Sequence, residues 1–293
     1  MLAVLEALLV TFLWSSSYVL MKVALVEVTP LLFAAIRYAI ASLILVAMNL
    51  RTGGIRGLGL DRRDLPLIAL AGVLGYTVAQ GLQIVGLSCL PATMVSLVLN
   101  FTPVFVLAME VALLGDSPSG VQVFGVGVAV TGAVLYFGGN VTLADLTGVS
   151  LVLISGLGWA AYLIVLRHFQ RSRAYSSLRL TSAVMCAGTA GLLGLAVAFE
   201  PIRVPSASSM SILIWLSVVN TAFAFYVWTH VLRILRAYEL SILQNSMLVQ
   251  IAIMSSLFLG ETMTISMIVG ICLVLLGILL VQLRVPDRRR LEP

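Results

Sequence analysis

The sequence is poor in charged side chains, which make up 10% of its 293 residues, against about 25% in soluble domains. Hydrophobic residues make up 61%, and apolar runs of about 20 residues, long enough to cross a hydrocarbon core, recur from end to end. This composition excludes a soluble fold and indicates helices packed in a lipid bilayer. The net charge of +5 is spread over short loops, so it reflects membrane orientation and indicates no nucleic-acid partner.

Residues that hold cofactors or perform catalysis are also scarce. The chain has three cysteines and two histidines, and the cysteines lack the spacing of a metal site or a disulfide framework. Neither a phosphate-binding P-loop nor a Ser-His-Asp spacing is found. We therefore expect no enzyme, no cofactor and no metal site.

The sequence does contain an internal repeat. A constant shift of 145 positions superposes the first half of the chain on the second without a gap. The stretch 92–132 returns as 237–277, and the match reaches back to Trp14 and Trp159. The two halves are therefore expected to be copies of one structural unit.

Ten membrane spans can be placed on the sequence, five in each half. Fourteen of the 17 basic residues fall in the tail or in connectors on one side, which the positive-inside rule places in the cytoplasm. Because five is an odd number, the second half must enter the membrane upside down. The expected spans are 2–24, 30–50, 65–87, 92–114, 120–139, 147–168, 177–199, 209–232, 237–259 and 264–283.

The expected fold is an all-α membrane protein with ten transmembrane helices arranged as two inverted five-helix repeats. Residues 1–140 form the first repeat, 146–285 the second, and 286–293 a basic cytoplasmic tail. Inverted repeats are typical of secondary transporters, whose binding site lies near the membrane midplane. We expect a multi-pass protein of the cell inner (plasma) membrane with both termini in the cytoplasm.

Several motifs resemble those of the drug/metabolite transporter superfamily, in its ten-span EamA-type members. Trp14-Ser15-Ser16-Ser17 precedes Lys22 in span 1, Phe33-Ala34-Ala35-Ile36-Arg37-Tyr38 follows Pro30 in span 2, and a Leu-Gly-(Asp/Glu) pattern ends spans 4 and 9. The resemblance covers nearly the whole chain. It implies export of amino acids or other small metabolites through a cavity bounded by spans 1, 3, 4, 6, 8 and 9.

Polar and aromatic side chains inside the spans are the candidates for that cavity, because an unpaired polar group in hydrocarbon is costly. Tyr76, Gln80 and Gln83, for example, share one helical face. Hydrogen bonds between helices and aromatic rings facing lipid are the alternative interpretations. The predicted substrate-binding residues are Trp14, Tyr18, Tyr76, Gln80, Gln83, Asn100, Trp159, Tyr162, Phe225, Trp228 and Asn245.

Charged and helix-breaking residues give further expectations. Glu110, one turn inside span 4, is the candidate for proton coupling, with ion pairing at the helix end as the alternative. Arg37 either caps carbonyls or pairs with a neighbour, as the resemblance implies, or anchors an anion. Pro103 should kink span 4 and free a backbone carbonyl. Asp116 and Glu261 should cap the helices that follow them.

Glycines in spans 5 and 10 provide smooth faces for close helix contact. This contact lies either within a monomer or at a homodimer seam. The glycines are Gly120, Gly125, Gly127, Gly132, Gly270 and Gly277.

The sequence thus predicts a secondary transporter that exports small neutral or zwitterionic metabolites, such as amino acids, by alternating access. A multidrug or lipophilic-cation exporter is one alternative. Such an exporter would favour a carboxylate at the centre of the cavity, and Glu110 would have to supply it. A non-transporting membrane scaffold is the other. The expected partners are a small-molecule substrate and the lipid bilayer, with the chain acting as a monomer or homodimer.

Overall fold

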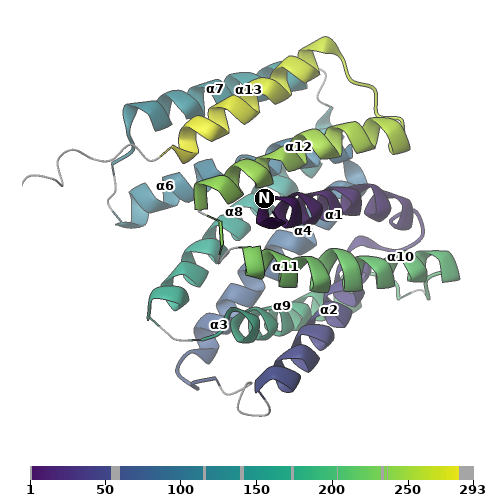
Figure 1. Cartoon of the computed structure of the whole chain (residues 1–293). Coiled ribbons are helices and arrows are strands. Elements are labelled where there is room, and N and C mark those ends of the chain that lie inside the picture. Colours follow the sequence, from purple (N-terminus) through teal and green to yellow (C-terminus); the bar gives the residue numbers. More distant parts are fainter. Residues whose placement is uncertain are drawn as a thin grey trace, which may run out of the picture.

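The computed structural model describes residues 2–53, 60–114, 117–138, 142–172, 175–202, 204–231, 234–235 and 237–283. Within these residues the chain forms helices and no strand. Nine helical units are long and apolar enough to cross a membrane, and a shorter apolar helix spans Leu243–Leu259. The protein is therefore an all-α membrane protein with ten transmembrane helices in two inverted five-helix repeats (Figure 1).

Seven spans are continuous helices and three are built from successive helical segments. The continuous spans are α1 (Leu2–Ala24), α2 (Pro30–Gly53), α7 (Gly120–Phe137), α8 (Leu143–Ser172), α9 (Ser177–Phe199), α12 (Ala237–Leu259) and α13 (Ile265–Gln282). The segmented spans are α3 (Leu65–Gly72) with the π-helix η2 (Val73–Gln80) and α4 (Gly81–Cys89), α5 (Ala92–Leu99) with α6 (Thr102–Leu114), and α10 (Ala207–Ser217) with the π-helix η3 (Val218–Phe223) and α11 (Ala224–Val231).

Span 4 breaks at Asn100, as Pro103 predicts. Proline has no N–H and leaves the Leu99 carbonyl without its helical partner. The Thr102 hydroxyl donates to that carbonyl at 2.7 Å. Both segments pack against α8, but α5 also packs against α12 whereas α6 also packs against α13. Leu248, the repeat mate of Pro103, lies in an unbroken α12.

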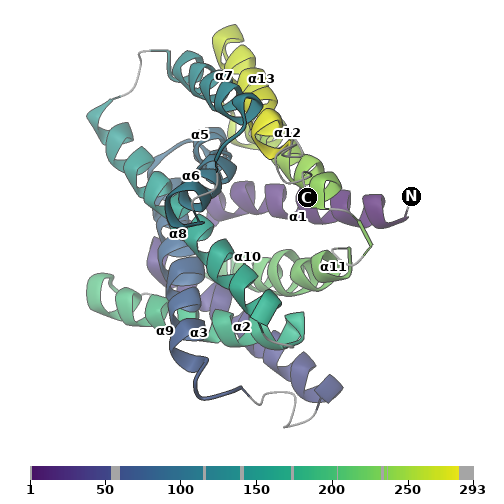
Figure 2. The same ribbon diagram turned by 90° about the vertical axis from the view of Figure 1, so that its left-hand side faces the viewer.

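Repeat mates pack against each other across the bundle. α2 lies along α9, and α7 lies along α13, which both views show side by side (Figures 1 and 2). A Cβ added to Gly125 would lie 2.7 Å from the Gly277 carbonyl oxygen, and one added to Gly132 would lie 2.7 Å from that of Gly270. Gly127, like Gly120, has nothing within 4 Å of such an atom. Gly125, Gly132, Gly270 and Gly277 therefore serve the packing of two helices within one chain.

The expectation that Glu261 caps the helix after it is wrong. Its carboxylate accepts hydrogen bonds from the N–H groups of Ala92 and Thr93, at 2.6 and 3.2 Å, and so caps α5 in the other repeat. The following helix, α13, is capped by Thr264 instead. A carboxylate can leave its own helix whenever another N-terminus lies closer, because any N-terminus attracts negative charge. The matching expectation for Asp116 and the tail at 286–293 lie outside the described residues.

Two more carboxylates connect the halves at the same end of the bundle, where α1 ends and α2 begins. Glu200 accepts hydrogen bonds from two N–H groups in the first turn of α2, at 3.0 and 2.8 Å. Glu27 accepts from the hydroxyls of Ser206 and Ser209 at the start of α10, at 2.5 and 2.6 Å. Together with Glu261, they join the two repeats at this end.

Candidate functional site

Aromatic side chains from the two halves meet between α1 and α11. The ring of Trp14 on α1 has its centroid 5.6 Å from that of Phe225 and 5.1 Å from that of Trp228, both on α11. All three side chains are half-buried. The structure thus brings together three residues that the sequence predicts for the site.

A second aromatic group joins α2, η2 and α8. The ring of Tyr76 meets those of Tyr38 and Tyr162 edge-on, with centroids 5.3 and 6.1 Å away. The ring of Trp159 lies 4.8 Å from that of Tyr162. Tyr76 is fully buried and Trp159 is half-buried, so the group extends from the core to a more open face.

Two glutamines lie beside these rings, each with one amide atom engaged. Gln80 Oε1 accepts a hydrogen bond from the Tyr38 hydroxyl at 2.7 Å, and Gln83 Nε2 donates to the Tyr18 hydroxyl at 3.0 Å. Within the described part of the chain, Gln80 Nε2 and Gln83 Oε1 have no protein partner. Both side chains are half-buried, so each amide is oriented and still offers a ligand one hydrogen-bonding atom.

Each half contains a π-helix at an equivalent position. η2 begins at residue 73 and η3 at residue 218, which the repeat shift of 145 relates. π-Helices are rare and often mark functional sites. η2 contributes Tyr76 and Gln80 to the group described above, and η3 contributes Thr221, whose hydroxyl donates to the Leu216 carbonyl five residues earlier. Side-chain periodicity gave no sign of these segments.

Arg37 lies among these elements with 6% of its surface exposed. Its Nε donates to the Thr221 hydroxyl at 3.0 Å, and its Nη1 lies 3.0 Å from the Met21 sulfur. Its guanidinium carbon is 5.6 Å from the ring centroid of Tyr38. The partners that the structure gives it are thus a hydroxyl, a thioether and a ring; it pairs with neighbouring side chains, and no carbonyl is among these partners.

Three predicted residues have their contacts elsewhere. Asn100 donates to the Ser96 carbonyl of its own span at 3.1 Å, beside the break between α5 and α6. Asn245 is buried and donates to Gln282 Oε1 at 3.0 Å, which ties α12 to α13. Glu110 is half-buried near the end of α6.

Two polar residues that the sequence analysis did not select attach α1 to its neighbours. Gln250 on α12 accepts from Ser15 at 3.0 Å and donates to Thr11 at 3.2 Å. Asn220 on η3 donates to Ser16 and Ser17, each at 3.0 Å. These serines therefore follow the interhelical hydrogen-bonding interpretation. A carboxamide within a largely apolar span, the feature that also marks Asn245, was the signal that could have identified both residues.

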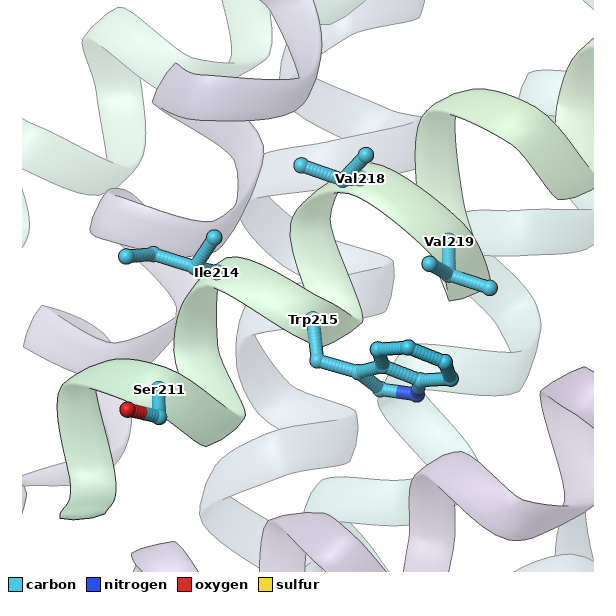
Figure 3. A pocket seen from close by; sticks show the side chains of 5 residues that line it. All are labelled: Ser211, Ile214, Trp215, Val218 and Val219. Carbon is cyan, nitrogen blue, oxygen red and sulfur yellow. The ribbon is translucent and has the colours of Figure 1, made fainter.

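Two surface hollows lie apart from these residues. One runs along α10 and η3, where Trp215 and its neighbours line a single helix face (Figure 3). The other lies on the outer faces of α7 and α13, beside Phe124 and Leu273. Their apolar walls suit lipid chains. In the described part of the chain, no three His, Cys, Asp or Glu side chains are grouped as a metal site.

Comparisons with known proteins agree with this arrangement. The chain is 30% identical over 287 residues to the uncharacterised transporter YvbV of Bacillus subtilis, covering 94% of this chain and 91% of that one. It is 27% identical over 303 residues to a probable terminal-alkyne amino-acid exporter of Streptantibioticus cattleyicolor, covering 98% and 96%. A solved crystal structure with 18% identity superposes with a TM-score of 0.68 over 96% of both chains, and this likeness shows the fold.

The model of the EamA-like transporter family matches the sequence twice, over residues 1–138 and 146–283. These two matches cover nearly the whole chain, and each falls on one five-helix repeat. The protein belongs to the EamA-like transporter family.

Proposed function

We propose that this transporter exports small neutral or zwitterionic metabolites, amino acids among them, and releases them chemically unchanged. The observation that supports this most directly is the pair of oriented glutamines, Gln80 and Gln83, each with one amide atom left for a ligand. Aromatic rings from both repeats lie beside them. Polar but uncharged hydrogen-bonding groups among aromatic surfaces suit a solute that is small, polar and without net charge.

Alternating access is supported by the contacts that join the two repeats at both ends of the bundle. At one end, Glu27, Glu200 and Glu261 bridge the repeats. At the other end, the hydroxyl of Tyr175 in the second repeat donates to the carboxylate of Asp64 in the first, at 2.7 Å. With both termini in the cytoplasm of an inner membrane, the end bridged by the three glutamates is the outer one. Rocking of the two repeats would break the bridges at one end at a time and open the site to that side.

Flux measurements on reconstituted protein test the proposal. Proteoliposomes loaded with labelled amino acids should lose label only when the transporter is present. Gln83→Ala removes one hydrogen bond to the solute and should raise the half-saturating concentration about tenfold. Thr131→Ala, on an exposed face of α7, is the matched control and should behave like the wild type.

Three results would count against the proposal in different ways. Absence of flux for every amino acid would reject it. Efflux of ethidium, a lipophilic cation, in place of amino acids would favour the multidrug alternative, for which the Trp14, Phe225 and Trp228 rings would supply cation–π contacts. If Gln83→Ala and Thr131→Ala had the same half-saturating concentration, Gln83 would not be a substrate-binding residue.

A further inference from the structure

Arg37 is a cation buried within the bundle, with 6% of its surface exposed. It lies seven residues after Pro30, about 10 Å along the axis of α2 from that end. Among the described residues, no carboxylate forms an ion pair with it. A charged side chain inside a membrane protein is expensive, and it persists where it pairs with another group or performs a function.

The guanidinium is only partly satisfied by the groups around it. Arginine carries five N–H donors in a planar fork, and here Nε and Nη1 are engaged by Thr221 and Met21. A thioether sulfur is a weak acceptor, and a threonine hydroxyl is uncharged. A structural arginine would be expected to saturate its donors on carbonyls or a carboxylate, because a buried charge with weak partners is destabilising. Donors on the remaining edge of the fork are left for a ligand.

The position of Arg37 connects it to the oriented glutamines. The next residue, Tyr38, donates to Gln80 at 2.7 Å. Met21, which contacts the Arg37 guanidinium, lies one turn along α1 from Tyr18, whose hydroxyl accepts from Gln83 at 3.0 Å. The guanidinium thus lies where α1, α2 and η3 meet, near the ring of Tyr38 and one turn of α1 away from Tyr18.

We propose that Arg37 binds the carboxylate of a zwitterionic substrate through its remaining N–H groups, which makes the site selective for amino acids over their carboxamides and over cations. This inference rests on the proposed function and specifies its substrate class. Arginine suits the role because its fork matches the two oxygens of a carboxylate. The same charge repels lipophilic cations, so one residue would both attract the substrate and exclude the alternative class.

The first test changes the ligand and leaves the protein intact. Leucine and leucinamide differ in the carboxylate that Arg37 would bind. Each is used to compete with labelled leucine for uptake into proteoliposomes that contain the wild-type protein. Leucinamide should require a concentration at least about 30-fold higher than leucine, in line with the loss of a buried, hydrogen-bonded charge pair.

The second test changes Arg37. Arg37→Gln should raise the half-saturating concentration of leucine at least about 30-fold and should not raise that of leucinamide, which carries only a positive charge, so that the preference for leucine disappears. Arg37→Lys keeps the charge without the fork and should retain part of the discrimination. Arg51→Gln, the same substitution at an exposed position of the same helix, should match the wild type.

Discrimination between leucine and leucinamide shows whether Arg37 binds the substrate or only stabilises the fold. A purely structural Arg37 would predict that Arg37→Gln weakens both ligands equally, and that result would overturn the inference. If Arg37→Gln did not fold, equal competition by leucine and leucinamide on the wild type would overturn it. In either case, leucine flux through the wild type would leave the proposed function standing. If the wild type moved no amino acid, both proposals would fail.

Discussion

At the scale of single residues, sequence patterns identified which side chains belong inside the bundle more reliably than which of them meet. Gln80 and Gln83 were selected because they share a helix face with Tyr76, and the structure places both beside tyrosines. Asn245 was selected on the same grounds, yet it pairs with Gln282. A helical stripe specifies a direction from one axis, whereas the neighbour in that direction depends on how the helices pack.

Glu27 gives a pH-dependent prediction at this scale. Hydrogen bonds from Ser206 and Ser209 hold the pKa of its carboxyl below the ordinary value of 4.5. A lowered folded-state pKa means that this contact stabilises the protein fully above about pH 4.5 and is lost as the pH falls through the folded value. The thermal midpoint of the wild type should therefore exceed that of Glu27→Gln near pH 6, and the difference should vanish at low pH.

A matched pair of serine variants tests whether the hydrogen bonds to Glu27 cause this pH dependence. Ser209→Ala removes a donor to Glu27 and should reduce the difference in midpoint between pH 6 and low pH. Ser211 lies on the same helix but donates to the Ala207 carbonyl, so Ser211→Ala should keep the wild-type pH profile. A profile that Glu27→Gln left unchanged would show that this contact does not help to hold the two repeats together.

At the scale of elements, local chemistry predicted helix ends and breaks but not the form of the helices between them. Pro103 predicted the interruption of span 4 because a missing N–H has a local effect. The π-helices η2 and η3 give no such signal. The wider turns of these π-helices are accommodated by contacts with other spans. In η2, for example, the Thr77 hydroxyl donates to the Gly188 carbonyl at 2.9 Å. The π-helices therefore depend on tertiary packing, which the side-chain periodicity of a single segment does not reveal.

The packing of α7 on α13 gives a prediction for this scale. In Gly132→Ala the new Cβ would lie 2.7 Å from the Gly270 carbonyl oxygen and from the Val274 nitrogen. Backbone atoms cannot move aside as a flexible side chain can, so the helices must separate, at a cost of about 1–3 kcal/mol. We expect a lower thermal midpoint in detergent.

Gly127→Ala is the control for this substitution. It lies on the same helix with nothing within 4 Å of the added carbon. Alanine favours the helix by up to about 1 kcal/mol over glycine, so this variant should melt at or slightly above the wild-type temperature. Equal midpoints for the two variants would show that α7 and α13 do not approach this closely.

At the scale of the whole molecule, the repeat was the most informative feature of the sequence. In the structure, two pairs of repeat mates pack on each other, α2 on α9 and α7 on α13, a contact that the shift of 145 does not by itself predict. The shift also did not anticipate that span 4 breaks while its mate α12 does not. This asymmetry matches the difference between Pro103 and its mate Leu248, because only proline removes a helical N–H.

The proposed orientation can be tested with a native cysteine. Cys89 is exposed at the end of α4, the end that faces outward if both termini are cytoplasmic. Cys186 and Cys272 lie well inside α9 and α13, where lipid slows reaction with a charged reagent. A membrane-impermeant maleimide should therefore label the wild type in spheroplasts, and Cys89→Ser should abolish that label. Labelling of Cys89 only in inside-out vesicles would reverse the topology, and the carboxylate-bridged end would then face the cytoplasm.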